Sequence, residues 1–234
     1  MNFRVTKEQI KELYELQPHL KKTKRYKRSL AYRETNYNHV QKMLELFGLL
    51  VDDFHLKDID HDKVIALILA HDLGEIGMKF DIGCYEHRNN EEISKEKSRQ
   101  ENITMMDLAS KHGIFLLNLC DEYKEQKTRE SQLVKALDRL DAQIRILGVK
   151  GIKHEPTQDR ADFAMRNLLS VAEIFPEIAQ LVEQILEQAK DDASFKDHKF
   201  LCFTKKAKFK WNPEWKIPNL EKDTATPPAL NARE

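Results

Sequence analysis

Glycine and proline are both scarce in this sequence, with 7 residues of each in a chain of 234. A β-sandwich or barrel needs many tight turns, which these two residues usually form, so their scarcity favours long helices. The sequence also lacks a strand pattern strong enough to predict a sheet, and it lacks a glycine-rich phosphate loop. We therefore predict an all-α fold, a helical bundle with extra C-terminal helices and an irregular tail.

Cysteine is scarce as well, since the chain has only Cys84, Cys120 and Cys202, far apart in the sequence. An odd number of cysteines with no C-x-x-C pair argues against a disulfide scaffold and indicates a reducing compartment. The first residues lack the apolar stretch of a signal peptide, and no run reaches the roughly 18 apolar residues of a membrane span. We therefore expect a cytoplasmic protein that does not enter a membrane.

The chain has no net charge, because its 39 Lys and Arg residues balance its 39 Asp and Glu residues. This balance disfavours nucleic acid and anionic membranes as partners. Hydrophobic residues make up 41% of the chain, which is typical of a folded, water-soluble protein. From residue 203 the composition shifts to Lys, Pro, Thr and Asn. We therefore divide the chain into a folded domain at 1–200 and a polar, Lys- and Pro-containing tail at 201–234.

Apolar residues at helical spacing predict most of the secondary structure. The expected helices begin near Thr6, Thr35, Asp60, Glu91, Ile114, Thr128, Gln158 and Pro176. Thr6 and Gln9 have the spacing of a capping box at the first of these helices. Gly74 and Gly77 end the third helix in an irregular loop, and the charged stretch from Glu91 predicts one or two exposed helices.

The most apolar run in the chain, residues 64–70, leads directly into His71 and Asp72. A buried carboxylate is costly unless a cation or a metal ion partners it. Adjacent helical side chains point about 100° apart, so these two can share one point only if it lies close between them. A metal ion about 2.0–2.5 Å from each ligand meets that demand. A second His-Asp pair, His61 and Asp62, lies in a polar turn that we interpret as a helix cap.

Two more residues are candidate ligands, and each also has a simpler interpretation. His39 begins the second helix on the side of its apolar stripe, where a core histidine bonded to a carbonyl explains it. Asp138 lies in a polar stripe on the helix from Thr128, where a solvated face with an Asp141–Arg145 pair explains it. Spacing alone leaves both assignments open.

Together these residues resemble the H…HD…D signature of the HD-domain phosphohydrolases, and in particular of the HD-domain 5′-deoxynucleotidases. The segments that carry the resemblance are 20–25 (L-K-x-x-x-R), 33–39 (the approach to the first His), 71–75 (HDxxE) and 134–138 (V-K-x-x-D). The resemblance covers roughly residues 20–145, about half of the chain. It implies an HD-domain helical bundle with one divalent metal ion, whose ligands would be His39, His71, Asp72 and Asp138.

The resemblance also implies a chemistry. The metal, for which Mn, Co, Mg, Zn, Fe and Ni all remain open, would activate a water and neutralise phosphoryl charge. Glu75, four residues after His71 and so on the same helical face, would orient or deprotonate that water or protonate the leaving group. Asp81 would be a second catalytic carboxylate, with a loop-capping aspartate as the alternative. Arg25 and Arg33 would bind the phosphate, with a solvated connection as the alternative for this basic stretch.

The predicted function is therefore a metal-dependent phosphohydrolase that releases phosphate from (deoxy)nucleoside 5′-monophosphates. The alternatives are a hydrolase of deoxynucleoside triphosphates or other small phosphates, and a non-catalytic binding or regulatory protein on the HD scaffold. Two departures from the family pattern, Asn38 for an acidic residue and Phe80 for a glycine, fall around the nucleotide pocket. The expected partner is a small phosphorylated substrate. Related enzymes are often dimers, so a homodimer is an assembly to test.

Overall fold

The computed structural model of the protein describes residues 3–25, 35–53, 56, 58–78, 90–148 and 167–182. Within these ranges the secondary structure is helical, and the single β feature is an isolated antiparallel bridge between Lys24 and Thr35. The predicted all-α fold is confirmed for this part of the chain. Contacts divide the protein into two compact units, Met1–Asp141 and Ala142–Glu234. The boundary that we predicted at residue 200 lies outside the described residues.

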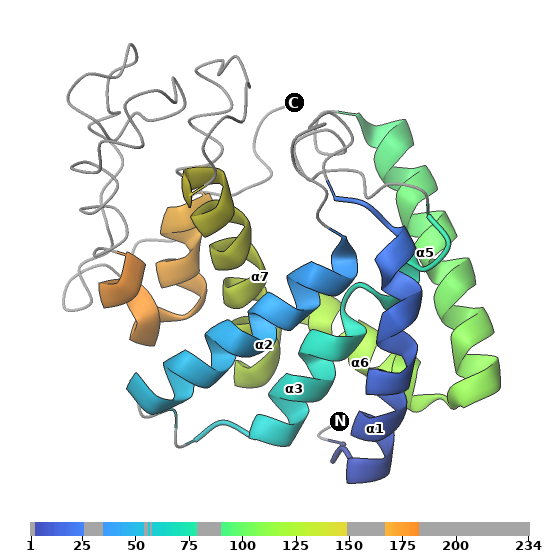
Figure 1. The fold of residues 1–234 in the computed structure, drawn as a ribbon, viewed down its shortest axis with the longest axis horizontal. Coiled ribbons are helices and arrows are strands. Elements are labelled where there is room, and N and C mark those ends of the chain that lie inside the picture. Colours follow the sequence, from blue (N-terminus) through green and yellow to red (C-terminus); the bar gives the residue numbers. More distant parts are fainter. Residues whose placement is uncertain are drawn as a thin grey trace. The chain divides into compact units, whose positions relative to one another are not determined.

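The first unit holds most of the helices that the structure describes (Figure 1). They are α1 (Lys7–Leu16), η1 (Gln17–Lys22), α2 (Asn36–Asp53), α3 (His61–Ala70), η2 (Leu73–Glu75), α5 (Glu91–His112), α6 (Phe115–Glu125) and the larger part of α7 (Arg129–Gly148), where η denotes a 3₁₀ helix. In the second unit, residues 167–174 and 179–182 are helical, and η3 (Pro176–Ile178) begins with the proline that was predicted to start a helix. None of the described helices is long and apolar enough to span a membrane.

Two of the helix starts follow from local side-chain caps. Thr6 Oγ1 accepts a hydrogen bond from Gln9 N at 3.2 Å, and Gln9 Oε1 accepts one from Thr6 N at 3.0 Å. This reciprocal pair is the predicted capping box of α1. At α3, the side chain of Asp60 accepts from Lys63 N at 3.1 Å. The polar turn around His61 is therefore a helix cap, as predicted.

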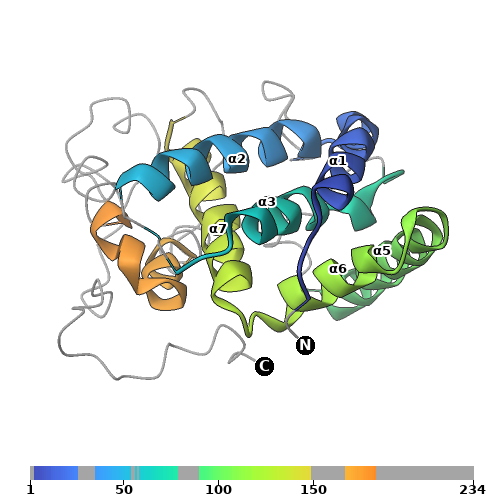
Figure 2. The same cartoon turned by 90° about the horizontal axis from the view of Figure 1, so that it is seen from below.

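Helix α3 is the centre of the first unit. It packs against α1, α2 and α6, and Figure 2 shows it between α2 and α6. All residues from 64 to 70 except Ile65 are buried, as their apolar character predicted. Each fully buried Leu or Ile side chain stabilises the fold by about 1.5–3 kcal/mol. Because the core fixes this helix so firmly, it also fixes His71, which is the C-cap residue at its end.

Helix α5 lies against η2, the 3₁₀ turn that follows α3. The approach is close because Gly74 has no side chain: a Cβ atom there would lie 3.1 Å from Glu101 Cβ. Gly77 has a φ of +89°, a conformation that favours glycine, and it ends this turn. The stretch predicted as one or two exposed helices is the single helix α5, which buries Met105 and Leu108.

Candidate metal centre

Three of the predicted ligands meet at one point. The donor atoms of His39, His71 and Asp72 all lie within 4.8 Å of one another. His39 comes from the first turn of α2, and His71 and Asp72 follow directly after α3. The two imidazole rings pack edge to face with their centroids 5.3 Å apart. A single metal ion could therefore bind all three donors.

His71 is oriented as a metal ligand would be. Its Nδ1 lies 2.7 Å from the carbonyl oxygen of Ile68, and since a carbonyl only accepts, Nδ1 carries the hydrogen. Its Nε2 is buried, lies 3.4 Å from Asp72 Oδ1, and has no hydrogen-bond partner among the described residues. Burial lowers the pKa of His71, which keeps the ring in the neutral form that binds metals. A cation between Nε2 and Oδ1 would satisfy both atoms.

His39 is held in the same way by a residue that we had not assigned to the site. Its Nδ1 lies 2.6 Å from Asp141 Oδ2, and a carboxylate only accepts, so Nδ1 carries the hydrogen. Its Nε2 then faces Asp138 Oδ1 at 3.3 Å. Burial and Arg25 lower the pKa of His39, but its contacts with Asp138 and Asp141 outweigh them and the net shift is upward.

Asp141 therefore corrects the interpretation of the polar stripe on α7. A solvated face was one of the two interpretations that we left open, but Asp141 is only 6% exposed because it lies behind His39. A carboxylate that accepts from the far nitrogen of a ligating histidine is common at metal sites, where it fixes the tautomer of the ring. The sequence did contain one signal, since Asp141 is three residues after Asp138 and shares its helix face.

The two aspartates each turn one oxygen toward a histidine and the other toward a cation. Asp138 Oδ2 accepts from Lys135 Nζ at 3.1 Å, and Asp72 Oδ2 accepts from Arg25 Nη1 at 3.2 Å. Burial raises the pKa of Asp138, but Lys135 and His39 lower it by more than burial raises it. The pKa of Asp138 is therefore well below its usual value. Both carboxylates are thus kept charged. Asp72 belongs to the group of three donors, whereas Asp138 is not part of that group and contacts it through His39.

Arg25 was predicted to bind phosphate, and the structure places it at the metal centre. Its side chain is 12% exposed and forms an ion pair with Asp72. The phosphate-binding role stays a prediction. Arg33 and Asp81, the other predicted substrate-binding and catalytic residues, lie outside the described residues.

Glu75 contacts the start of α2, and our argument that it shares a helical face with His71 is wrong. Our argument needed a helix that continues past His71, whereas α3 ends at Ala70 and Glu75 belongs to the 3₁₀ turn η2. Its Oε2 accepts from the Asn36 side chain at the start of α2, and its Oε1 lies 2.8 Å from Lys97 Nζ of α5. Lys97 stands among many charged residues in the sequence, so no pattern singled it out.

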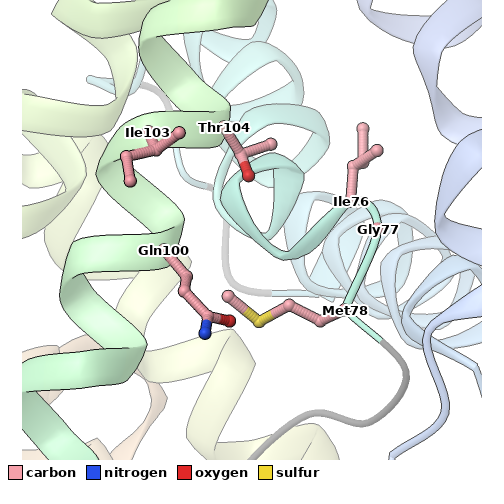
Figure 3. A pocket seen from close by; sticks show the side chains of 6 residues that line it. All are labelled: Ile76, Gly77, Met78, Gln100, Ile103 and Thr104. Carbon is pink, nitrogen blue, oxygen red and sulfur yellow. The ribbon is translucent and has the colours of Figure 1, made fainter.

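An open cavity of about 260 Å³ is lined by the residues that directly follow η2 and by residues of α5. Figure 3 shows Gln100 and Met78 pointing toward each other across it, with Thr104 of α5 and Ile76 along its edge. The lining begins at Ile76, the residue directly after Glu75.

Comparison with known proteins identifies the family of the chain. The family model described as the HD domain matches residues 18–195. A Xenopus laevis protein named 5′-deoxynucleotidase HDDC2 is 28% identical over 164 residues, which are 69% of this chain and 76% of the relative. A Dictyostelium discoideum protein of the same name is 30% identical over 128 residues, 52% of this chain and 66% of the relative. No solved structure is significantly similar to the chain. Because the match spans most of the chain and all of the candidate metal centre, the protein belongs to the HD-domain family.

Proposed function

We propose that this protein is a divalent-metal-dependent phosphohydrolase that releases phosphate from (deoxy)nucleoside 5′-monophosphates. The observation that carries the proposal is the pair of buried contacts between a histidine nitrogen and an aspartate oxygen at the centre. His39 Nε2 faces Asp138 Oδ1 at 3.3 Å, and His71 Nε2 faces Asp72 Oδ1 at 3.4 Å. Because the other nitrogen of each ring carries the hydrogen, both contacts bring two acceptors together unless a proton or a cation lies between them.

The proposed ligands are His39, His71, Asp72 and Asp138. Two imidazoles and two carboxylates form a mixed N/O set that suits a divalent transition metal, with positions left for water and a phosphate oxygen. Once bound, the ion would lower the pKa of its water from about 15.7 toward roughly 7 and would neutralise charge on the phosphoryl group.

The proposed catalytic residue is Glu75. Its side chain is 7% exposed, and Asn36 and Lys97 each hold one of its oxygens. A carboxylate fixed in this way can orient a water or transfer a proton without first reorganising. Asp81 is the proposed second carboxylate, and Arg25 and Arg33 are the proposed phosphate-binding residues. The names of the two relatives support a deoxynucleotide as the substrate.

The experiment is a substrate panel. The purified protein is stripped with a chelator and reloaded with Mn²⁺, Co²⁺ or Mg²⁺. It is then given deoxy- and ribonucleoside mono- and triphosphates, and released phosphate and polyphosphate are measured. We expect phosphate from monophosphates only in the metal-loaded protein. Release of triphosphate from deoxynucleoside triphosphates would instead support the alternative substrate class.

The control variant for the panel is Glu75→Gln, which keeps the size of the side chain and removes its charge. It should bind metal as the wild type does and lose most of the turnover, because general acid–base catalysis contributes about 10²- to 10⁴-fold. Stoichiometric metal with no release from any nucleotide would contradict the proposal and would leave a non-catalytic HD scaffold.

A further inference from the structure

Tyr123 contacts two of the proposed ligands from a helix that supplies none of them. It lies on α6, whereas His71 follows α3 and Asp138 lies on α7. Its hydroxyl is 2.9 Å from Asp138 Oδ2, and its ring packs edge to face on His71 with the centroids 5.5 Å apart. One side chain therefore joins ligands that are 67 residues apart in the sequence (138 minus 71).

The direction of each hydrogen bond at Tyr123 follows from the chemistry of its neighbours. Lys135 Nζ lies 3.1 Å from the hydroxyl and 3.1 Å from Asp138 Oδ2. An ammonium group only donates and a carboxylate only accepts. The hydroxyl must therefore accept from Lys135 and donate to Asp138. Asp138 Oδ2 thus receives two donors, and its Oδ1 is the oxygen that faces His39.

Helix α6 is itself fixed in place next to Tyr123. Glu122 Oε1 lies 3.0 Å from Lys63 Nζ of α3, and these side chains are only 9% and 3% exposed. The same oxygen accepts from Thr128 Oγ1 at 2.6 Å, just before α7 begins. A buried, hydrogen-bonded ion pair restricts the geometry of the elements that it joins. Glu122 thereby connects α6 both to the helix that ends at His71 and to the start of the helix that carries Asp138.

We propose that Tyr123, together with Lys135, is a positioning residue of the metal centre. The pair holds Asp138 so that a single oxygen, Oδ1, binds the ion, and the Tyr123 ring limits the rotation of His71. This inference rests on the proposed function, because it requires that Asp138 and His71 bind a metal. Neither Tyr123 nor Lys135 was assigned a role from the sequence.

The test is the metal affinity of Tyr123→Phe, which removes the hydroxyl and leaves the ring. Mn²⁺ and Co²⁺ are titrated into the chelator-treated protein, and heat and the Co²⁺ absorption spectrum are recorded. Loss of a group that orients a ligand typically weakens metal binding about 10- to 100-fold, and we expect a loss in that range. The Co²⁺ spectrum should also change, because Asp138 Oδ2 keeps Lys135 as its only remaining donor of the two and the carboxylate can turn this oxygen toward the ion. The matched control is Tyr14→Phe, at a tyrosine that is 45% exposed on α1.

A second variant tests the same inference if Tyr123→Phe fails to fold. Lys135→Met acts from a side chain that is 25% exposed and should also weaken metal binding, while Lys135→Arg should restore part of it. Wild-type affinity and an unchanged Co²⁺ spectrum in both Tyr123→Phe and Lys135→Met would overturn the inference and leave the proposed function standing. If the wild type itself binds no metal, the proposed function fails instead.

Discussion

His39 donates its Nδ1 hydrogen to Asp141 across 2.6 Å, and this bond joins the start of α2 to α7. Because Nδ1 is occupied, Nε2 is the nitrogen left to bind a metal ion. The bond also adds electron density to the ring, which strengthens Nε2 as a ligand. The proposed ligand His39 thus depends on the charge of Asp141.

Asp141→Asn should weaken metal binding by about 10- to 100-fold, the usual effect of losing such a partner. The amide has no negative charge, and its NH₂ group can turn toward Nδ1 and favour the wrong tautomer. Metal titration of the variant checks this. Asp107→Asn, at an exposed aspartate of α5 that pairs with Lys111, is the control and should bind metal normally. Equal affinities in the two variants would show that Asp141 has no such role.

Metal affinity should rise as the pH rises through the pKa of His39, which lies above the ordinary histidine value. The pKa of His39 is raised by Asp138 and Asp141, so below that pKa a proton competes with the metal for the ring. Raising the pH removes this proton and strengthens binding. The pKa of His71 is lowered, so a proton competes with the metal for this ring only at more acidic pH. Calorimetry in buffers of different ionisation enthalpy should detect proton release on binding, and pH-independent binding without release would contradict this account.

Lys97→Met should lower kcat without changing metal affinity. Lys97 Nζ lies 2.8 Å from Glu75 Oε1, and its loss leaves the carboxylate with one fewer partner and free to turn. Because Asn36 still holds the other oxygen, we expect a loss of kcat of about 10-fold, a part of what general acid–base catalysis contributes. Lys95→Met, whose side chain is 75% exposed on the same helix, is the control. Lys97→Arg should recover part of the rate. If Lys97→Met and Lys95→Met have the same kcat, Lys97 does not position Glu75.

Gly74→Ala should destabilise the protein by about 1–3 kcal/mol, the typical cost of overpacking. The new Cβ would lie 3.1 Å from Glu101 Cβ and 3.3 Å from Glu101 Cα, and backbone cannot move aside cheaply. Gly48→Ala is the matched control, because nothing lies within 4 Å of its Cβ position on α2. This control should stabilise the protein by about 0.5–1 kcal/mol, since alanine favours helix. Urea unfolding of both variants measures the difference, and equal stability would mean that α5 does not pack closely on η2.

The sequence predicted those parts of the site that depend on local pattern. The apolar run before His71 identified a buried helix, and the structure shows that helix at the core. The position of Glu75 depended instead on where the helix ends. The chain leaves α3 at Ala70, and Glu75 is positioned by Asn36, 39 residues earlier, and by Lys97 of α5.

Asp141 and Tyr123 could not have been assigned from local pattern. Asp141 is 102 residues from His39, and in the sequence it is one of many charged residues on a helix face. Tyr123 is at the end of the short apolar helix that we predicted, where a tyrosine is unremarkable without knowledge of what lies opposite. Only the packing of α6 against its neighbours shows that its hydroxyl meets Asp138.

The most direct test of the metal centre is the metal content of two aspartate variants, Asp138→Ala and Asp62→Ala. Asp138 is a proposed ligand beside His39, whereas Asp62 is exposed in the first turn of α3. Each protein is loaded with Mn²⁺ or Co²⁺, passed through a desalting column, and analysed by mass spectrometry for metal per chain. We predict that the wild type and Asp62→Ala keep one ion per chain and that Asp138→Ala keeps none. Equal metal content in both variants would contradict the ligand set, and with it the proposed mechanism.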